Sequence, residues 1–167
     1  MKELDHLVPL LAKKKQLDDD IAAVIRAGDP NVRFSTKKFV PDLGEFYFLK
    51  LATVFQDLKQ SVKSNADFDF LAILDDATRM LFGIDVNQAR IEVKTRYAQI
   101  GNNHIKGLKP TKFDLLAFVA LADDYTCRHI GIIRSSDIVI DRQERIRCSD
   151  YYRKGLVRWK TSHWTEL

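Results

Sequence analysis

Glu92 and Lys94 are the residues whose types and spacing best suit hydrolytic chemistry in this 167-residue chain. They belong to the stretch Arg90–Arg96, in which apolar and polar residues alternate strictly. A period of two is typical of a β-strand with one buried face, and it places the carboxylate and the ammonium on the same exposed side. A carboxylate can hold a metal ion, and a nearby lysine can orient or deprotonate a water molecule. The pair therefore supplies two parts of a metal-dependent hydrolytic site, although Glu-x-Lys alone is common on solvated strands.

Two further carboxylates lie upstream, at the start of a predicted strand over residues 68–74 that should be buried on both faces. Asp67 and Asp69 share one face there. Burying a carboxylate against such an apolar strand costs several kcal/mol unless something compensates, and a cation is the obvious candidate. Asp69 is preferred as a ligand because it sits within the strand rather than at its start, and Asp67 remains the competing candidate.

Helices are predicted on the N-terminal side of these strands. Residues 1–27 have helical spacing that ends at Gly28-Asp29-Pro30. A second, largely buried helix should open at Asp42-Leu43-Gly44-Glu45, with Asp42 as its N-cap and an apolar set that extends to Leu58. Glu45 has two interpretations: it caps the helix and complements its dipole, or it is a functional carboxylate that points toward the site.

Residues 77–86 are ambiguous between a short helix capped by Asp75 and a hairpin strand, and the strand is favoured. The other predicted elements are a strand over 89–97, a basic loop over 101–111, a central strand over 113–122 covered on both faces, a strand over 127–133, and a turn or short helix at 135–137.

Composition and length describe one soluble globular domain. Hydrophobic residues make up 46% and charged residues 30% of the chain, and the apolar runs are far too short to span a membrane. Cys127 and Cys148 lie far apart without zinc-binding spacing, so neither a zinc site nor a disulfide framework is indicated. A reducing cytoplasm is the expected compartment.

The net charge of +4 is concentrated at the C-terminal end. Residues 142–167 hold seven Lys and Arg against three Asp and Glu, interleaved with tyrosines and tryptophans. Basic and aromatic residues together are typical of a surface that faces nucleic acid. The alternative is a solvated terminal helix whose arginine stems cover apolar surface.

The order of these elements resembles the PD-(D/E)xK nuclease superfamily, which has the restriction-endonuclease-like fold. The resemblance runs from about Gly44 to Asp137 and rests on Gly44-Glu45, Ala66-Asp67-Phe68-Asp69-Phe70, Ile91-Glu92-Val93-Lys94-Thr95-Arg96 and the strand opened by Phe113-Asp114. It departs from the family pattern at Phe68, which stands where the family has proline. Pro41-Asp42 precedes a helix and is not assigned to the site.

This resemblance implies an α/β fold in which helices flank a central mixed β-sheet. The chain would be a single domain, residues 1–167, with an N-terminal helical segment (1–30), a nuclease-like core (42–137) and a basic aromatic C-terminal segment (138–167). Asp69 and Glu92 would bind Mg²⁺ or Mn²⁺, with the Val93 carbonyl as a third oxygen. Lys94 would position or activate the attacking water, and Glu45 would be an auxiliary acid.

The implied function is a Mg²⁺-dependent endonuclease that cleaves DNA, of the restriction or defence type. Because two strands must be cut, a homodimer is expected. The alternative is a non-catalytic nucleic-acid-binding module or subunit that retains a nuclease-like core; a structural protein with surface ion pairs would leave Asp69 unexplained. The expected nucleic-acid contacts are Arg90, Arg96, Lys106, Lys109, Lys112, Arg153, Lys154 and Arg158.

Overall fold

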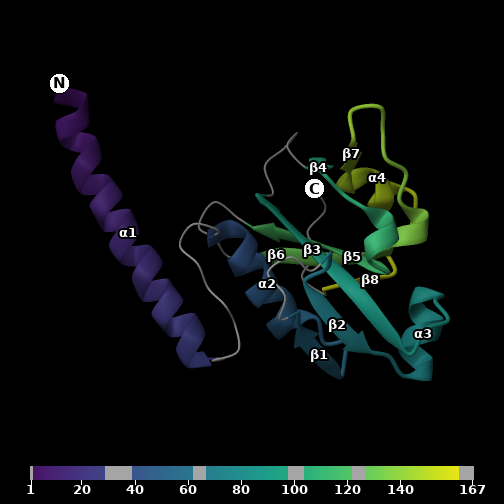
Figure 1. The fold of residues 1–167 in the computed structure, drawn as a ribbon. Coiled ribbons are helices and arrows are strands. Elements are labelled where there is room, and N and C mark those ends of the chain that lie inside the picture. Colours follow the sequence, from purple (N-terminus) through teal and green to yellow (C-terminus); the bar gives the residue numbers. More distant parts are fainter. Residues whose placement is uncertain (1, 29–38, 62–66, 98–103, 122–126, 162–167) are drawn as a thin grey trace.

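The computed structural model describes residues 2–28, 39–61, 67–97, 104–121 and 127–161 (Figure 1). The helices are α1 (Lys2–Gly28), α2 (Phe39–Leu51), α3 (Asp76–Phe82) and α4 (Cys148–Arg153), with short 3₁₀ turns η2 (Pro110–Lys112) and η3 (Ser135–Asp137). The strands are β1 (Asp57–Gln60), β2 (Phe70–Ile73), β3 (Gln88–Tyr97), β4 (His104–Lys106), β5 (Leu115–Leu121), β6 (Cys127–Arg134), β7 (Arg145–Arg147) and β8 (Trp159–Lys160).

Six strands form one mixed sheet in the order β1-β2-β3-β5-β6-β8. Neighbouring strands are antiparallel except β3 and β5, which run parallel with Glu92 beside Leu116 and Lys94 beside Phe118. The remaining strands, β4 and β7, form a separate two-stranded ribbon, the β4–β7 ribbon. The predicted class, α/β with a mixed sheet and flanking helices, is therefore confirmed.

The sheet separates two hydrophobic cores. Phe48 of α2 packs on one face with Phe70, Ile91 and other apolar residues of the strands. On the other face, Phe118 packs with the β4–β7 ribbon and with α4. Because β5 contributes alternate side chains to both cores, it is buried on both faces, as its nearly continuous apolar sequence predicts.

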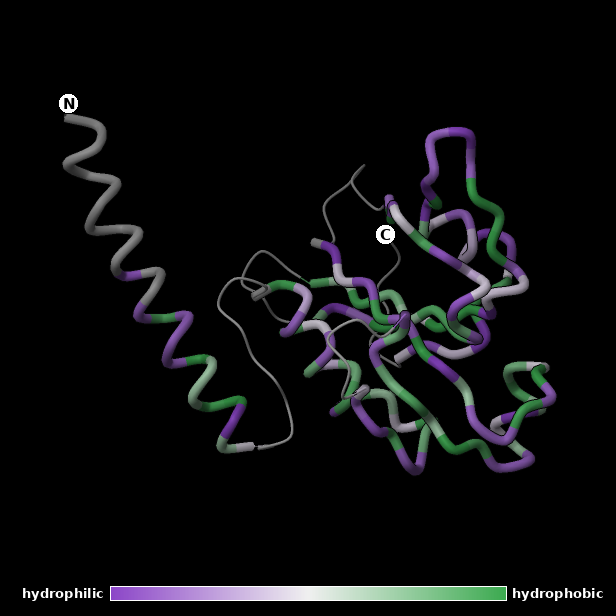
Figure 2. The backbone as a smooth tube through the Cα atoms, viewed as in Figure 1, coloured by the Kyte–Doolittle hydropathy of each residue, from purple (hydrophilic) through white to green (hydrophobic). Residues whose placement is uncertain are grey.

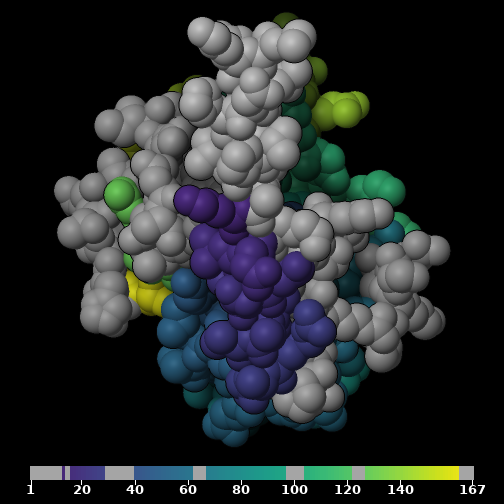
Figure 3. Space-filling view, turned by 90° about the vertical axis from the view of Figure 1, so that its left-hand side faces the viewer, coloured from purple at the N-terminus to yellow at the C-terminus, as the bar shows by residue number. Residues whose placement is uncertain are grey.

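Helix α1 follows its prediction closely, and its C-terminal half contributes to the core on the α2 side. Ala22 and Ile25 are buried, and Ile25 packs into that core. Figure 3 shows this half of α1 lying over the segment that runs from α2 to β1.

Helix α2 begins and ends earlier than predicted. It starts at Phe39, so Asp42 lies in its first turn and is not the N-cap, and it ends at Leu51. Proline is tolerated in a first helical turn, which explains why Pro41 does not delay the start. The apolar residue Leu58 belongs to β1 and packs against the same core, so it extended the apparent helical pattern from a different element.

The strand favoured for residues 77–86 is wrong, and the alternative of a capped helix is right. The Asp75 carboxylate caps α3 by accepting a hydrogen bond from the Thr78 amide at 2.8 Å. Gly83 ends the helix with φ +62°, a left-handed conformation that glycine adopts without steric cost. Both capping residues are visible in the sequence, but a short apolar stretch does not separate helix from strand by period.

Two smaller expectations also fail. The basic loop predicted over 101–111 contains β4 and the start of η2. Residues 101–103 of that loop lie outside the described residues, and so does Ala66. Strand β2 is not buried on both faces throughout, because Ile73 at its end is 48% exposed.

Cys127 and Cys148 are both free thiols.

Candidate active site

Asp69 lies immediately before β2, at the point where the regular pairing of β2 with β3 ends. The register pairs Phe70 with Ile91, and the Asp69 amide also donates to the Ile91 carbonyl at 2.9 Å. Asp69 and Phe70 thus both lie opposite Ile91, and two residues on one strand opposite one on its partner form a β-bulge. The Asp69 carbonyl turns toward the other neighbour and accepts from the Ser61 amide at 2.8 Å. Bulges re-aim side chains, and this one directs the Asp69 carboxylate toward β3.

The Asp69 carboxylate is fixed on the backbone of β3. Its Oδ2 accepts a hydrogen bond from the Val93 amide at 2.7 Å, where a regular ladder would supply a backbone carbonyl. In a strand, the amide and carbonyl of one residue point to the same side, so the Val93 carbonyl also points toward β2. The predicted pair of ligands, Asp69 and the Val93 carbonyl, is therefore brought to the same edge of β3.

The alternation predicted for β3 is present. Ile91, Val93 and Thr95 are buried, while Glu92 and Lys94 lie on the opposite side with side chains only 15% and 28% exposed. Lys94 Nζ forms an ion pair with Glu92 Oε1. The carboxylate and the ammonium therefore share one side of the strand, as their spacing predicts.

Glu92 lies in an unfavourable electrostatic environment. Burial raises its pKa above the ordinary value, and the negative charge of Asp69 raises it further, with a smaller effect from Asp67. Lys94 opposes these effects but does not cancel them. The contribution of Asp69 to this raised pKa reflects repulsion between the two carboxylates, which a cation bound by both would relieve.

The donor set suits a hard divalent cation. Two carboxylates and a backbone carbonyl are oxygen ligands of the kind that bind Mg²⁺ or Mn²⁺, with water completing the shell. Across the described residues, no three or more His, Cys, Asp and Glu side chains converge where they could hold a metal ion together. Asp69, Glu92 and the Val93 carbonyl supply oxygen donors of the kind that such a metal takes, and their part as its ligands stays a prediction.

The structure distinguishes Asp69 from Asp67. Asp67 is half exposed and pairs with Lys112, whose Nζ lies 3.2 Å from Asp67 Oδ2. Asp69, by contrast, is hydrogen-bonded to the same strand that carries Glu92. Geometry therefore favours Asp69, the preferred candidate, and gives Lys112 a pairing role that its sequence context did not predict.

Glu45 is held by a residue that sequence reasoning missed. Its Oε2 accepts a hydrogen bond from Gln60 Nε2 at 2.8 Å, and Gln60 pairs with Phe70 in the register of β1 and β2. Glu45 lies on α2, whose close approach to β3 depends on Gly44: a Cβ there would lie 1.7 Å from Thr95 Oγ1. The role predicted for Glu45, that of an auxiliary acid, stays a prediction.

Several cations expected to contact nucleic acid are engaged within the chain. Arg90 binds Asp114 through two hydrogen bonds, Nε to Oδ2 at 3.0 Å and Nη2 to Oδ1 at 2.8 Å. Arg96 Nε donates to the His104 carbonyl at 3.1 Å. Arg153 pairs with Asp150, and Arg158 pairs with Asp137. Most members of the predicted set are exposed, namely Arg96, Lys106, Lys109, Lys112, Arg153 and Lys154.

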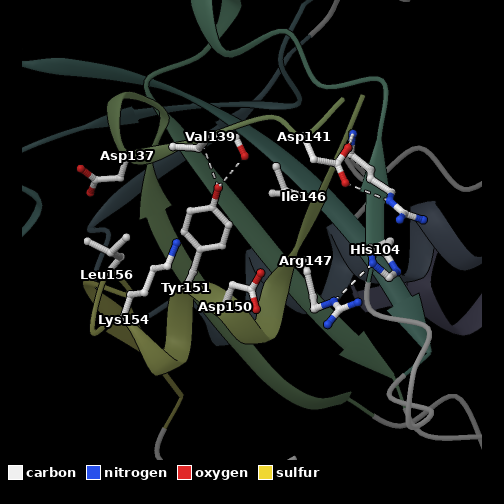
Figure 4. A pocket seen from close by; sticks show the side chains of 11 residues that line it. His104, Asp137, Val139, Asp141, Ile146, Arg147, Asp150, Tyr151, Lys154 and Leu156 are labelled. Carbon is white, nitrogen blue, oxygen red and sulfur yellow. Dashed lines mark hydrogen bonds and ion pairs between the residues drawn. The ribbon is translucent and has the colours of Figure 1, made fainter. Parts of the chain in front are cut away.

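A pocket of about 260 Å³ lies between the β4–β7 ribbon, α4 and the segment before β7 (Figure 4). Lys154, Arg147 and His104 are among its lining residues, and Arg147 Nε donates to His104 Nε2 at 3.3 Å. Neither Asp69 nor Glu92 lines this pocket. It is therefore a second polar region, which sequence reasoning did not find because its residues come from distant segments.

Comparisons with known proteins do not identify a function for this chain. No protein-family model matches the chain, and neither does any curated protein. Among solved structures, the bacterial homing endonuclease I-Ssp6803I is similar over 73% of this chain and 94% of that chain, with a TM-score of 0.41 and 9% identity. A similarity this low carries no inference about activity. None of the helices in the described part of the chain combines the length and apolar character needed to cross a membrane.

Proposed function

We propose that this protein is a Mg²⁺-dependent endonuclease that hydrolyses DNA phosphodiester bonds, of the restriction or defence type. The observation that carries the proposal is the carboxylate of Asp69 fixed on the Val93 amide. It lies beside the Glu92–Lys94 pair, whose glutamate has a raised pKa because of burial and of Asp69. A pair of acids of which one has a perturbed pKa, together with a lysine, is typical of metal-dependent phosphodiester hydrolysis.

Each residue has a chemical role in this proposal. Asp69, Glu92 and the Val93 carbonyl would hold the cation, Mg²⁺ or Mn²⁺, which lowers the pKa of a bound water and neutralises charge on the phosphodiester. Lys94 Nζ lies against Glu92, where it can donate a hydrogen bond to the attacking water or to a phosphate oxygen. The bulge at Asp69 holds the first ligand in place before substrate binds.

Plasmid cleavage tests the proposal directly. The purified protein should nick or linearise plasmid DNA with Mg²⁺ and fail to do so with EDTA. Lys94→Ala should abolish cleavage without loss of folding, while Lys50→Ala, on an exposed position of α2, should cleave at the normal rate. Cleavage that persists in Lys94→Ala, or in EDTA, would contradict the proposal.

Metal binding has a readout that does not depend on cleavage. Because a cation relieves the repulsion between Asp69 and Glu92, Mg²⁺ or Ca²⁺ should raise the thermal unfolding temperature of the wild-type protein. The rise should be absent in Asp69→Asn. An equal rise in both proteins would show that the ion binds elsewhere.

The second candidate function is a non-catalytic nucleic-acid-binding module. It is favoured by the ion pair between Lys94 and Glu92 and by the lack of a third acidic or imidazole ligand among the described residues. Such a module would bind DNA with steep salt dependence and would cleave no substrate at any metal concentration. The plasmid assay separates it from the nuclease.

A homodimer is part of the proposal, because cutting both strands of a duplex requires two sites. Sedimentation of the protein with and without a short DNA duplex tests this. A monomer that nicks only one strand would remove the dimer from the proposal and leave the hydrolytic site intact.

A further inference from the structure

The segment between η3 and β7, residues 138–144, projects from the molecule beside the β4–β7 ribbon (Figure 1). We call it the β7 loop. Its first residues are apolar and its tip is hydrophilic, as Figure 2 shows by colour. Val139 is 77% exposed, and every residue from Asp141 to Glu144 is exposed. A loop that projects this far is available to a large partner.

The tip of the β7 loop is held in one conformation by Asp141. Its Oδ1 accepts from the Gln143 amide at 2.8 Å and from the Arg145 amide at 3.0 Å, and its Oδ2 accepts from Arg145 Nε at 3.0 Å. The backbone closes the turn, with the Asp141 amide donating to the Arg145 carbonyl and the Glu144 amide donating to the Asp141 carbonyl, both at 3.0 Å. A preorganised loop loses little conformational entropy on binding.

The base of the loop is attached to the protein core. The Val139 amide donates to the hydroxyl of Tyr151 at 3.0 Å, a contact drawn in Figure 4. Tyr151 lies on α4, is 5% exposed, and packs with Phe118 of the central strand. The exposed tip therefore stands on a rigid base, which is the arrangement that a recognition element requires.

The side chains at the tip are suited to reading base edges. Arg142 and Gln143 are adjacent and exposed, and Arg142 forms no ion pair within the described part of the chain. Arginine makes two hydrogen bonds to guanine and glutamine makes two to adenine in the major groove of DNA. A two-stranded β-ribbon also fits that groove, whereas the major groove of an RNA duplex is too narrow.

Cations next to the loop are available to phosphates. The pocket in Figure 4 is lined by Arg147 and Lys154, and no described carboxylate pairs with either. The pocket's acids are neutralised by other arginines, as Asp141 is by Arg145 and Asp150 by Arg153. The positive charge left at the pocket is therefore that of Arg147 and Lys154, which can hold a DNA backbone.

The ribbon adjoins the row of side chains that carries the candidate active site. Arg96 lies on β3 in the same alternating row as Glu92 and Lys94, and it donates to the His104 carbonyl of β4. A duplex that lies along this row would therefore meet the ribbon and the β7 loop on the same side of the sheet.

We propose that the β7 loop is the sequence-reading element of this nuclease. Arg142 and Gln143 contact base edges in the major groove of duplex DNA, and Arg147 and Lys154 hold the adjacent phosphates. This inference rests on the proposed function, because it names how the same enzyme selects its DNA.

A randomised DNA duplex library tests the inference in the full chain. The wild-type protein in Ca²⁺ should enrich a defined sequence, and Arg142→Ala and Gln143→Ala should each lose preference at different positions of it. Affinity for the enriched duplex should fall about tenfold in each variant, the amount expected for loss of one two-bond base contact. The RNA duplex of that sequence should not compete.

Matched controls are Arg26→Ala and Gln16→Ala, which remove the same residue types from exposed positions of α1 and should leave the enriched sequence unchanged. An unchanged sequence in Arg142→Ala and Gln143→Ala, or no enrichment by a protein that cleaves plasmid DNA, would overturn the inference. Metal-dependent plasmid cleavage by the same preparations reports on the proposed function separately, so the two can fail independently.

Discussion

The Glu92 carboxylate of β3 differs sharply from two carboxylates near the β4–β7 ribbon, Asp137 and Asp141. Asp137 accepts two hydrogen bonds from Arg134, at 2.9 and 2.7 Å, and these lower the pKa of the carboxyl below its ordinary value. Desolvation raises the pKa of Asp141, but the hydrogen bonds from Arg145 and Gln143 together with the charge of Arg145 outweigh it, so the pKa is also lowered. For Glu92 the balance has the opposite sign, since burial and Asp69 raise its pKa.

This difference separates acids that stabilise the fold from acids kept in a reactive state. A carboxylate whose pKa is lowered by an arginine contributes to stability at neutral pH, whereas one whose pKa is raised reduces it. Of Asp137, Asp141 and Glu92, Glu92 alone is held in the unfavourable arrangement, which is the pattern expected where a cation is to bind. Four experiments, from the largest expected effect to the smallest, test these acids and the packing of the sheet around them.

Replacing Asp69, a candidate metal ligand, should have the largest effect, and that effect should be on the cleavage rate. Asp69→Asn keeps the hydrogen bond to the Val93 amide but lacks the charge that binds a cation, so the rate of Mg²⁺-dependent DNA cleavage should fall about a thousandfold. Single-turnover cleavage of a plasmid measures this rate. Asp85→Asn, at a fully exposed position paired with Arg79 at 3.8 Å, is the control and should cleave normally. A loss of less than about tenfold in Asp69→Asn would remove Asp69 from the site.

Acid should destabilise the side of the sheet that carries α4. His129 is buried against the edge of Tyr152, and burial lowers its pKa from 6.5 to about 4, with help from the charges of Arg128 and Lys160. Between these values the unfolded chain binds more protons than the folded one, so the free energy of unfolding falls as pH drops from 6.5 to about 4. The loss should approach roughly 3 kcal/mol.

Urea unfolding at several pH values measures this loss. His129→Gln has no group that titrates there, so its stability should depend less on pH, whatever its stability at neutral pH. An equally steep dependence in the variant would assign the effect to other groups.

Glycines set how closely each face of the sheet is covered. A Cβ at Gly44 would lie 1.7 Å from Thr95 Oγ1, and one at Gly131 would lie 1.9 Å from the Tyr152 hydroxyl. Gly44→Ala and Gly131→Ala should each lower the free energy of unfolding by about 1–3 kcal/mol. Gly28→Ala is the control, because nothing lies within 4 Å of a Cβ at that position. Chemical denaturation should show that it changes the free energy of unfolding by only about a few tenths of a kcal/mol. Equal effects at all three glycines would contradict the close approach.

Neutralising one acid from each region should give small changes of opposite sign. At pH 7, Asp137→Asn should lower the free energy of unfolding by about 1 kcal/mol, because a carboxylate with a lowered pKa stabilises the fold above its unfolded pKa. Glu92→Gln should raise it by a similar amount, about 1 kcal/mol. That gain should shrink as pH falls through the raised pKa of Glu92 and disappear below the ordinary value of 4.5, because Glu92 is then protonated in both the folded and the unfolded state.

Urea denaturation of both variants at pH 7 and at low pH measures these changes. Destabilisation by both substitutions at pH 7 would mean that Glu92 is a structural acid like Asp137, and the contrast between the two regions would be lost.

Several elements follow from the sequence by itself because their determinants are local. The alternation of β3 places Glu92 and Lys94 on one side, and the structure agrees. The apolar run of β5 and the helical spacing of α1 are equally direct. Periodicity expresses which face of an element is buried, and it needs no knowledge of the partner. The preference for Asp69 over Asp67 rested on a predicted position within the strand, whereas Asp69 lies immediately before β2.

Tertiary structure alone decided what these elements contact. The bulge at Asp69 depends on the register between β2 and β3, and the pair Arg90–Asp114 joins residues of two different segments. Arg96 and Arg158, predicted to face nucleic acid, also contact the His104 carbonyl and Asp137, and only the fold brings those segments together. The β4–β7 ribbon was missed for the same reason: three-residue strands carry too little period to be predicted, and pairing between distant segments forms them.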